Sequence, residues 1–200
     1  MTTPTPRFDR VVSLGCSCQP AYQIRRLLNV EEAQIFDWVI TEDRGVVHLI
    51  ENGTRDFLVR DDLRWIDGAM RSLRYGTRFL HEFPDEGSLE ARFDAHSERF
   101  AALGERWRAL MEADERVLFV RKHAWDDDPQ ATAETLRDAL RAAGPRLDFT
   151  LLYLTPPDQF DPSWRTEGIE HRAVRQPEPY TWKGDDTVWE TLLRDAGALS

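Results

Sequence analysis

The sequence predicts an α/β domain of three layers, in which a Rossmann-like, mostly parallel sheet is flanked by helices and carries an inserted β-hairpin. Three observations lead to this fold class. Short apolar segments rich in β-branched residues alternate along the chain with segments of helical periodicity. Such alternation is typical of parallel sheets. The 200 residues show no internal repeat and no long linker, and they suffice for one core.

The segments expected to form strands are short, apolar and bounded by glycine, proline or charged residues. IFDWVI at 35–40 is a further buried apolar run. The alternation of SLRYGTRFLHEF around Gly76 predicts the inserted hairpin over 72–83. The strands expected in the main sheet are 10–14, 116–124, 147–155 and 168–175.

Helical segments are recognised by apolar spacings of three and four and by their end signals. The strongest pattern runs from Ser88 to 112, where one face carries Leu89, Phe93, His96, Phe100, Leu103, Trp107 and Leu110. The other helices are expected over 20–28, 43–53, 131–144 and 185–197. Asp185 and Asp186 are expected to cap the last of these. The acidic run Asp126, Asp127 and Asp128 is interpreted as a solvated helix start, with cation binding as the alternative.

Composition restricts the classes of function. The formal net charge is −10, from 36 acidic and 26 basic side chains, and the two signs are interleaved. A basic stripe that could follow a phosphate backbone is missing, which argues against nucleic-acid binding. The sequence also lacks an apolar run long enough to span a membrane and a signal-peptide pattern at its start, so we expect a cytoplasmic protein. Residues 1–9 are expected to form a disordered tail and residues 10–200 a single α/β domain. The oligomeric state is not indicated.

Cys16 and Cys18 are the two cysteines of the chain, and they lie where the first strand turns into the first helix. In open α/β sheets, ligands and catalytic groups gather at the carboxyl ends of strands. The helix N-terminus is expected to lower the pKa of a thiol in the first turn, and Cys18 is the closer of the two. The alternative is that both thiols are small apolar fillers. A metal needs more ligands than Cys-x-Cys supplies, and redox pairs use Cys-x-x-Cys. We therefore expect no metal and no cofactor.

Several motifs carry a resemblance. Ser13, Leu14, Gly15, Cys18 and Ala21 form the pattern SLG-x-x-C-x-x-A, and YQIRRL and IFDWVIT follow it. Phe79, His81, Glu82 and Phe83 match a later F-x-HDF segment with Glu in place of Asp, and VLFVR ends in Arg121. Over residues 11–122 the chain resembles a poorly characterised bacterial family of unknown function, described as putative papain-like cysteine peptidases. The alternation of strands and helices argues against a true papain fold.

The resemblance implies a catalytic pair. It selects Cys18 as nucleophile and His81 as its base, with Asp37 or Glu82 orienting the imidazole. Each has an alternative interpretation: His81 as a surface histidine, Asp37 as the cap of a turn, and Glu82 as the exposed partner of an arginine. Cys16 is expected to pack without a catalytic role. His96 is interpreted as a core residue, and His123, at the end of a strand, is the reserve base.

The predicted function is a cysteine-dependent hydrolase, peptidase-like or an acyl transferase, acting on a peptide, acyl or glycan-type substrate. One alternative is an esterase of the SGNH kind with Ser17 as nucleophile, although the Gly-Asp-Ser opening and the late Asp-x-x-His of that class are missing. The other is a non-enzymatic module that binds a ligand or acts beside glycan enzymes. The catalytic pair predicts that the Cys18 sulfur and the His81 ring lie within direct or one-water hydrogen-bonding distance. A separation above about 8 Å would exclude the pair.

Overall fold

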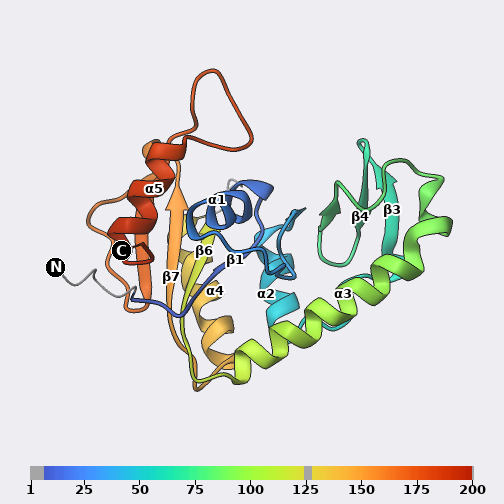
Figure 1. Cartoon of the computed structure of the whole chain (residues 1–200), viewed down its shortest axis with the longest axis horizontal. Coiled ribbons are helices and arrows are strands. Elements are labelled where there is room, and N and C mark those ends of the chain that lie inside the picture. The colour runs from blue at the N-terminus through green and yellow to red at the C-terminus, as the bar shows by residue number, and fades with distance from the viewer. Residues whose placement is uncertain (1–6, 124–127, 200) are drawn as a thin grey trace.

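A four-stranded parallel sheet forms the centre of the molecule in the computed structural model, which describes residues 7–123 and 128–199 (Figure 1). Each strand pairs in parallel with its neighbour, and the chain moves across the sheet in one direction. The spatial order is β1 (Arg10–Ser13), β6 (Arg116–Lys122), β7 (Asp148–Thr155) and β8 (Ile169–Ala173). The four predicted strands are confirmed, and β1 lies at an edge.

Helices cover both faces of this sheet, which confirms the predicted three layers. Successive strand side chains point to opposite faces. Val117 and Phe119 therefore join one core cluster, with apolar residues of α2, α3 and α4, whereas Leu118 and Val120 join a second, with residues of α1 and α5. The helices are α1 (Cys18–Leu28), α2 (Asp43–Glu51), α3 (Ser88–Glu112), α4 (Pro129–Ala143) and α5 (Asp186–Asp195).

The inserted hairpin is part of a larger unit, a four-stranded antiparallel sheet. The expected hairpin corresponds to the β4–β5 pair, but a tighter hairpin precedes it, in which β3 and β4 are joined by Asp67 and Gly68. Both turn residues have positive φ, +48° and +75°. An Asp-Gly pair between two strands is a strong hairpin signal, and the interpretation centred on Gly76 overlooked it. In spatial order the strands are β2 (Val39–Ile40), β5 (Arg78–Phe79), β4 (Ala69–Ser72) and β3 (Leu63–Ile66).

Helix α3 joins the two sheets, as its course from the small sheet to the main sheet in Figure 1 shows. At the middle of the helix, Phe100 packs on Phe57 and Phe79, and its ring centroid lies 4.8 Å from that of Phe57 and 5.6 Å from that of Phe79. Seven residues further along the helix, Trp107 packs on Phe36 and on Phe119 of β6. The apolar stripe predicted for this helix therefore serves two sheets rather than one.

The N-termini of α4 and α5 are capped by aspartate side chains. Asp128 accepts hydrogen bonds from the backbone N–H of Gln130 and Ala131, and Asp185 does the same for Thr187 and Val188. Asp126 and Asp127 lie outside the described residues, and so do residues 1–6 of the predicted tail. Beyond that tail segment, Phe8 is buried against α5 and its neighbours.

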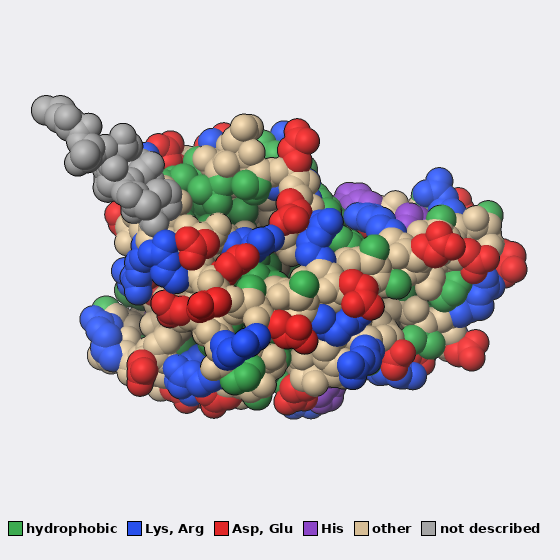
Figure 2. Space-filling view, turned by 60° about the horizontal axis from the view of Figure 1, so that its bottom comes forward, with side chains coloured by type: hydrophobic (Ala, Val, Ile, Leu, Met, Phe, Trp, Pro, Cys, Tyr) green, Lys and Arg blue, Asp and Glu red, His purple; other side chains and the backbone are tan. Residues whose placement is uncertain are grey.

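The surface carries both signs of charge close together. On the face shown in Figure 2, arginine and lysine side chains lie between aspartate and glutamate side chains. Arg10, for example, is within ion-pair distance of both Glu32 and Glu115. Across the part of the chain that the structure describes, every helix is too short or too polar to cross a membrane.

Candidate active site

The corner that carries both cysteines is shaped by one close backbone contact. β1 ends at Ser13. Gly15 then takes φ +63°, a backbone conformation that residues other than glycine rarely adopt. A Cβ built on Gly15 would lie 2.5 Å from the Phe36 carbonyl oxygen. The chain next passes through buried Cys16 and reaches Ser17, the extended N-cap of α1. Cys18 is therefore the first residue of the helix, which begins two residues before the predicted start at position 20.

The close approach of Gly15 to the Phe36 backbone can be tested by substitution. Gly15→Ala is expected to destabilise the protein by about 1 kcal/mol or more beyond Gly68→Ala, because both introduce a side chain at positive φ but only Gly15 meets backbone atoms. Nothing lies within 4 Å of a Cβ built on Gly68, so it isolates the conformational cost. Urea unfolding of the two variants measures the difference. Equal midpoints would mean that the corner tolerates the added atom by moving.

The structure brings Cys18 and His81 together, 63 positions apart in the sequence. The Cys18 Sγ atom lies 3.7 Å from His81 Nε2, well inside the limit set by the sequence analysis. Two backbone contacts place the segment that contains His81 beside Cys18. The Thr41 N–H donates to the Gly15 carbonyl, which ties the end of β2 to the cysteine corner. Val39 of β2 pairs with Phe79 of β5, and His81 follows β5 by two residues.

The environment of the Cys18 thiol favours its neutral form. Burial raises the pKa of Cys18 to about 11, and the negative charges of Glu82 and Asp37 act in the same direction. A backbone hydrogen bond lowers the pKa of Cys18, as expected of a helix N-terminus, but burial and the carboxylates outweigh it. Local helix geometry gave the expectation, whereas burial and carboxylates from distant segments decide the outcome. Cys18 enters any reaction as a thiol that must lose its proton.

The raised pKa predicts a distinctive alkylation profile. In a Cys16→Ala background, the rate of Cys18 modification by iodoacetamide is expected to rise about tenfold per pH unit from pH 6 to near pH 10. At neutral pH it is expected to be about a hundredfold slower than that of a free thiol, since the pKa lies two units higher. Mass spectrometry of the labelled protein measures the rates. A plateau below pH 7 would instead reveal a thiolate paired with an imidazolium.

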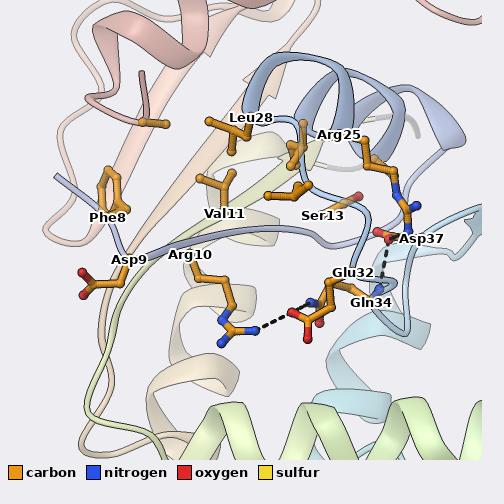
Figure 3. Close-up of a pocket in the computed structure, with 14 residues that line it drawn as sticks. Phe8, Asp9, Arg10, Val11, Ser13, Arg25, Leu28, Glu32, Gln34 and Asp37 are labelled. Carbon is orange, nitrogen blue, oxygen red and sulfur yellow. Dashed lines mark hydrogen bonds and ion pairs between the residues drawn. The ribbon is translucent and has the colours of Figure 1, made fainter. Parts of the chain in front are cut away.

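Asp37 faces a different pocket from the one beside His81. Its Oδ2 atom accepts hydrogen bonds from Arg25, at 3.1 Å, and from the Gln34 backbone N–H, at 3.0 Å. Figure 3 shows this group at one end of a pocket that also holds the Arg10–Glu32 pair. Burial raises the pKa of Asp37, which the Gln34 and Arg25 hydrogen bonds oppose. Asp37 thus caps the turn before β2, the alternative interpretation of this residue.

Glu82 follows His81 directly, but its carboxylate turns toward α3. The side chain is 2% exposed, and its Oε1 atom lies 3.3 Å from Arg99. Glu82 is therefore the partner of an arginine, as its alternative interpretation held, but a buried one. Its Oε2 atom is buried without a hydrogen-bond partner among the described residues. Within that same part of the chain, no hydrogen bond joins Glu82 or Asp37 to the His81 ring, so the orienting acid is unassigned.

The other histidines lie away from the thiol contact. His123 is buried, and its Nδ1 atom is 2.8 Å from the Tyr153 hydroxyl. His96 lies half-buried on α3, with its ring centroid 5.3 Å from that of Phe83. Cys16 is buried, and its sulfur lies 3.7 Å from the hydroxyl of Ser17. These placements agree with the packing interpretations of Cys16 and His96.

Cys18 and His81 open into a cavity of about 340 Å³. Lys122, at the end of β6, points into it and donates to the Gln19 side chain at 3.2 Å; burial lowers the pKa of this lysine. Sequence reasoning missed Lys122 and Gln19 as site residues, although Trp38 stands in the IFDWVI run that it had singled out. The cavity is lined by Ser17, Cys18, Gln19, Trp38, Ile40, Leu80, His81, Lys122, Tyr180 and Trp182.

A metal centre is not assembled by the described residues, none of which form a cluster of three or more His, Cys, Asp or Glu ligands. The two thiols are free, and Cys18 is directed to His81. The cavity beside Cys18 presents the side chains of Cys18, His81 and Lys122.

Comparison with known proteins places this arrangement in a family. A family model described as "Putative papain-like cysteine peptidase (DUF1796)" matches residues 9–155. An uncharacterised protein of Acanthamoeba polyphaga mimivirus is 26% identical over 135 residues, which make up 55% of this chain and 60% of that protein. The chain thus spans less than two thirds of the length of this relative. No solved structure matches. Because the family model covers more than half of the chain, with both Cys18 and His81 inside the match, the protein belongs to the DUF1796 family of papain-like cysteine peptidase candidates.

Proposed function

We propose that this protein is a cysteine-dependent hydrolase or acyl transferase in which Cys18 attacks an acyl carbonyl and His81 accepts the thiol proton. The observation that carries the proposal is the 3.7 Å contact between Cys18 Sγ and His81 Nε2 at the wall of a cavity. A nucleophile and a base within hydrogen-bonding reach are the common core of acyl-transfer sites.

The first half of the proposed reaction forms a thioester. As the sulfur–carbon bond forms, the thiol proton moves to His81 Nε2, because the raised pKa of Cys18 disfavours a preformed thiolate. Negative charge develops on the carbonyl oxygen. Backbone N–H groups in the first turn of α1 and the Lys122 ammonium are the available donors beside the sulfur. The tetrahedral intermediate then breaks to the thioester, and the leaving group takes the proton from His81.

The second half regenerates the thiol. Water, or an acceptor hydroxyl or amine, attacks the thioester carbonyl and gives a proton to His81. The carbon–sulfur bond breaks, and the proton returns to Cys18. Hydrolase and transferase differ only in which acceptor reaches the thioester.

The test compares two cysteine variants on a panel of p-nitrophenyl esters and peptide 7-amino-4-methylcoumarin amides. Cys18→Ala is expected to lower turnover by at least about a thousandfold, whereas Cys16→Ala retains it. A mass increase equal to the acyl group, found on the peptide that contains Cys18, would identify the thioester. Equal turnover by Cys18→Ala would contradict the proposal and direct attention to Ser17. Inactivity of the unmodified protein on the whole panel would favour the binding-module alternative.

A further inference from the structure

Exposed apolar side chains gather at the mouth of the Cys18 cavity. Leu80 is 42% exposed, Trp182 46% and Tyr180 73%, and all three line the cavity, which Trp38 and Ile40 complete. Large apolar side chains left in water at one concave site mark a surface that binds a partner or ligand. Trp38 also holds φ +63°, a strained conformation for a bulky residue.

Tyr180 and Trp182, which we call the aromatic wall, stand in a loop that is hydrogen-bonded to α1, the helix that begins with Cys18. Gln19, which follows Cys18, donates to the Trp182 carbonyl and to the Gln176 side chain, both at 3.2 Å. One turn further, buried Gln23 donates to the Lys183 carbonyl at 2.7 Å. The Trp182 ring meets the edge of Tyr22, with centroids 5.2 Å apart. Two buried glutamines and a ring contact thus fix the loop between β8 and α5 beside the sulfur.

The charge of the lining is one-sided. Among the described residues that line the cavity there is no aspartate or glutamate, and Lys122 is the one lysine or arginine. In a chain of net charge −10, the described lining offers a cationic group no carboxylate partner, and Glu82 and Asp37, whose charges act on Cys18, are not part of that lining. An apolar group is accommodated by the rings and by Leu80 and Ile40, and negative charge on the carbonyl oxygen is accommodated by Lys122.

Resting on the proposed function, we propose that this cavity is an acyl-group subsite and that the substrates are acyl compounds with a bulky apolar group beside the scissile carbonyl. Benzene fills an apolar cavity of roughly 150 Å³, so about 340 Å³ holds a ring or a six-carbon chain together with the carbonyl. Tyr180 and Trp182 lie beyond residues 9–155, the region of the family match. The C-terminal loop thus contributes to substrate preference together with Trp38, Ile40 and Leu80 of the family region, which also contains the reacting pair.

The first measurement needs no turnover. In a Cys16→Ala background, Cys18 is labelled with methyl or benzyl methanethiosulfonate; its sulfur forms a disulfide with the reagent, methanesulfinate leaves, and the thiol proton is released. The benzyl-to-methyl rate ratio, corrected by the ratio for glutathione, is expected to be about ten or more. Trp182→Ala is expected to lower this ratio by about fivefold, and Trp182→Phe to retain most of it. Leu73→Ala, which removes a 59% exposed side chain outside the cavity, leaves it unchanged.

The second measurement compares p-nitrophenyl acetate with p-nitrophenyl hexanoate. The hexanoate preference in kcat/KM is expected to fall in Trp182→Ala in parallel with the labelling ratio. Labelling preference without Cys18-dependent turnover would support the subsite and overturn the hydrolase. Cys18-dependent turnover with a flat labelling ratio would overturn the subsite alone, and so would turnover confined to a polar, glycosylated acyl donor.

Discussion

Replacing His81 with alanine is expected to lower kcat/KM for acyl substrates by about a hundredfold to ten-thousandfold, the range that general acid–base catalysis supplies. The reason is the neutral thiol. With the pKa of Cys18 at about 11, hardly any thiolate is present at pH 7, and His81 Nε2, 3.7 Å from the sulfur, is the base within reach. Added imidazole is expected to restore part of the rate, because it fits the space that the ring leaves.

Two other histidine variants make this result specific. His96→Ala removes a ring that packs on Phe83, so it is expected to retain turnover. His123→Gln keeps a polar group opposite the Tyr153 hydroxyl. If His123→Gln lost turnover and His81→Ala kept it, the base would have to be reassigned to His123. Circular dichroism of each variant separates a lost base from a lost fold.

Arg121→Met is expected to reduce the free energy of unfolding by about 3 to 5 kcal/mol, the cost of breaking a buried ion pair from one side. Arg121 is fully buried, and it donates to Asp43 Oδ1 through two nitrogens, at 2.6 and 3.0 Å. Asp43 Oδ2 is buried and has no hydrogen-bond partner among the described residues. Methionine keeps most of the side-chain volume but leaves the Asp43 carboxylate without its counter-charge.

A double variant tests the assignment of this cost. Asp43→Leu with Arg121→Met is expected to be less destabilised than the sum of the single variants, because both charges are then absent. Urea unfolding of the four proteins gives the coupling. A cost below about 1 kcal/mol for Arg121→Met would contradict a structural role for the pair. Arg121 also donates to the carbonyls of Leu14 and Thr41, so slower Cys18 labelling in the single variant would link it to the site.

The main sheet and its helices could be predicted because their residues carry local patterns. β7 contains the apolar run LLYL at 151–154, and α4 begins at Pro129 after its N-cap Asp128 and ends before Gly144. The small sheet is different. β2 and β5 have two residues each, too few to show a period, and their pairing is decided by tertiary contacts.

The candidate site also has one part that local sequence patterns predict and another that depends on tertiary contacts. The position of Cys18 follows from the strand-to-helix pattern, but its partner came from the resemblance, since no local rule joins positions 63 apart. The roles of the acids failed for a related reason. Arg25 and Arg99 hold Asp37 and Glu82, and only the folded chain shows which arginine reaches which carboxylate. The aromatic wall was also out of reach, because exposed Trp and Tyr in a loop have no periodicity.

The proposed nucleophile and base follow strands of different sheets: Cys18 begins the helix after β1 of the parallel sheet, and His81 follows β5 of the antiparallel sheet. Packing of Phe100 and Trp107 on opposite sheets sets their separation through α3. A small rigid-body shift between the sheets alters the sulfur-to-nitrogen distance while each sheet keeps its own hydrogen bonds. The reactivity of Cys18 is therefore more sensitive to the relative position of the two sheets than helix content or melting temperature is. A partly assembled chain would carry both groups and still be inert.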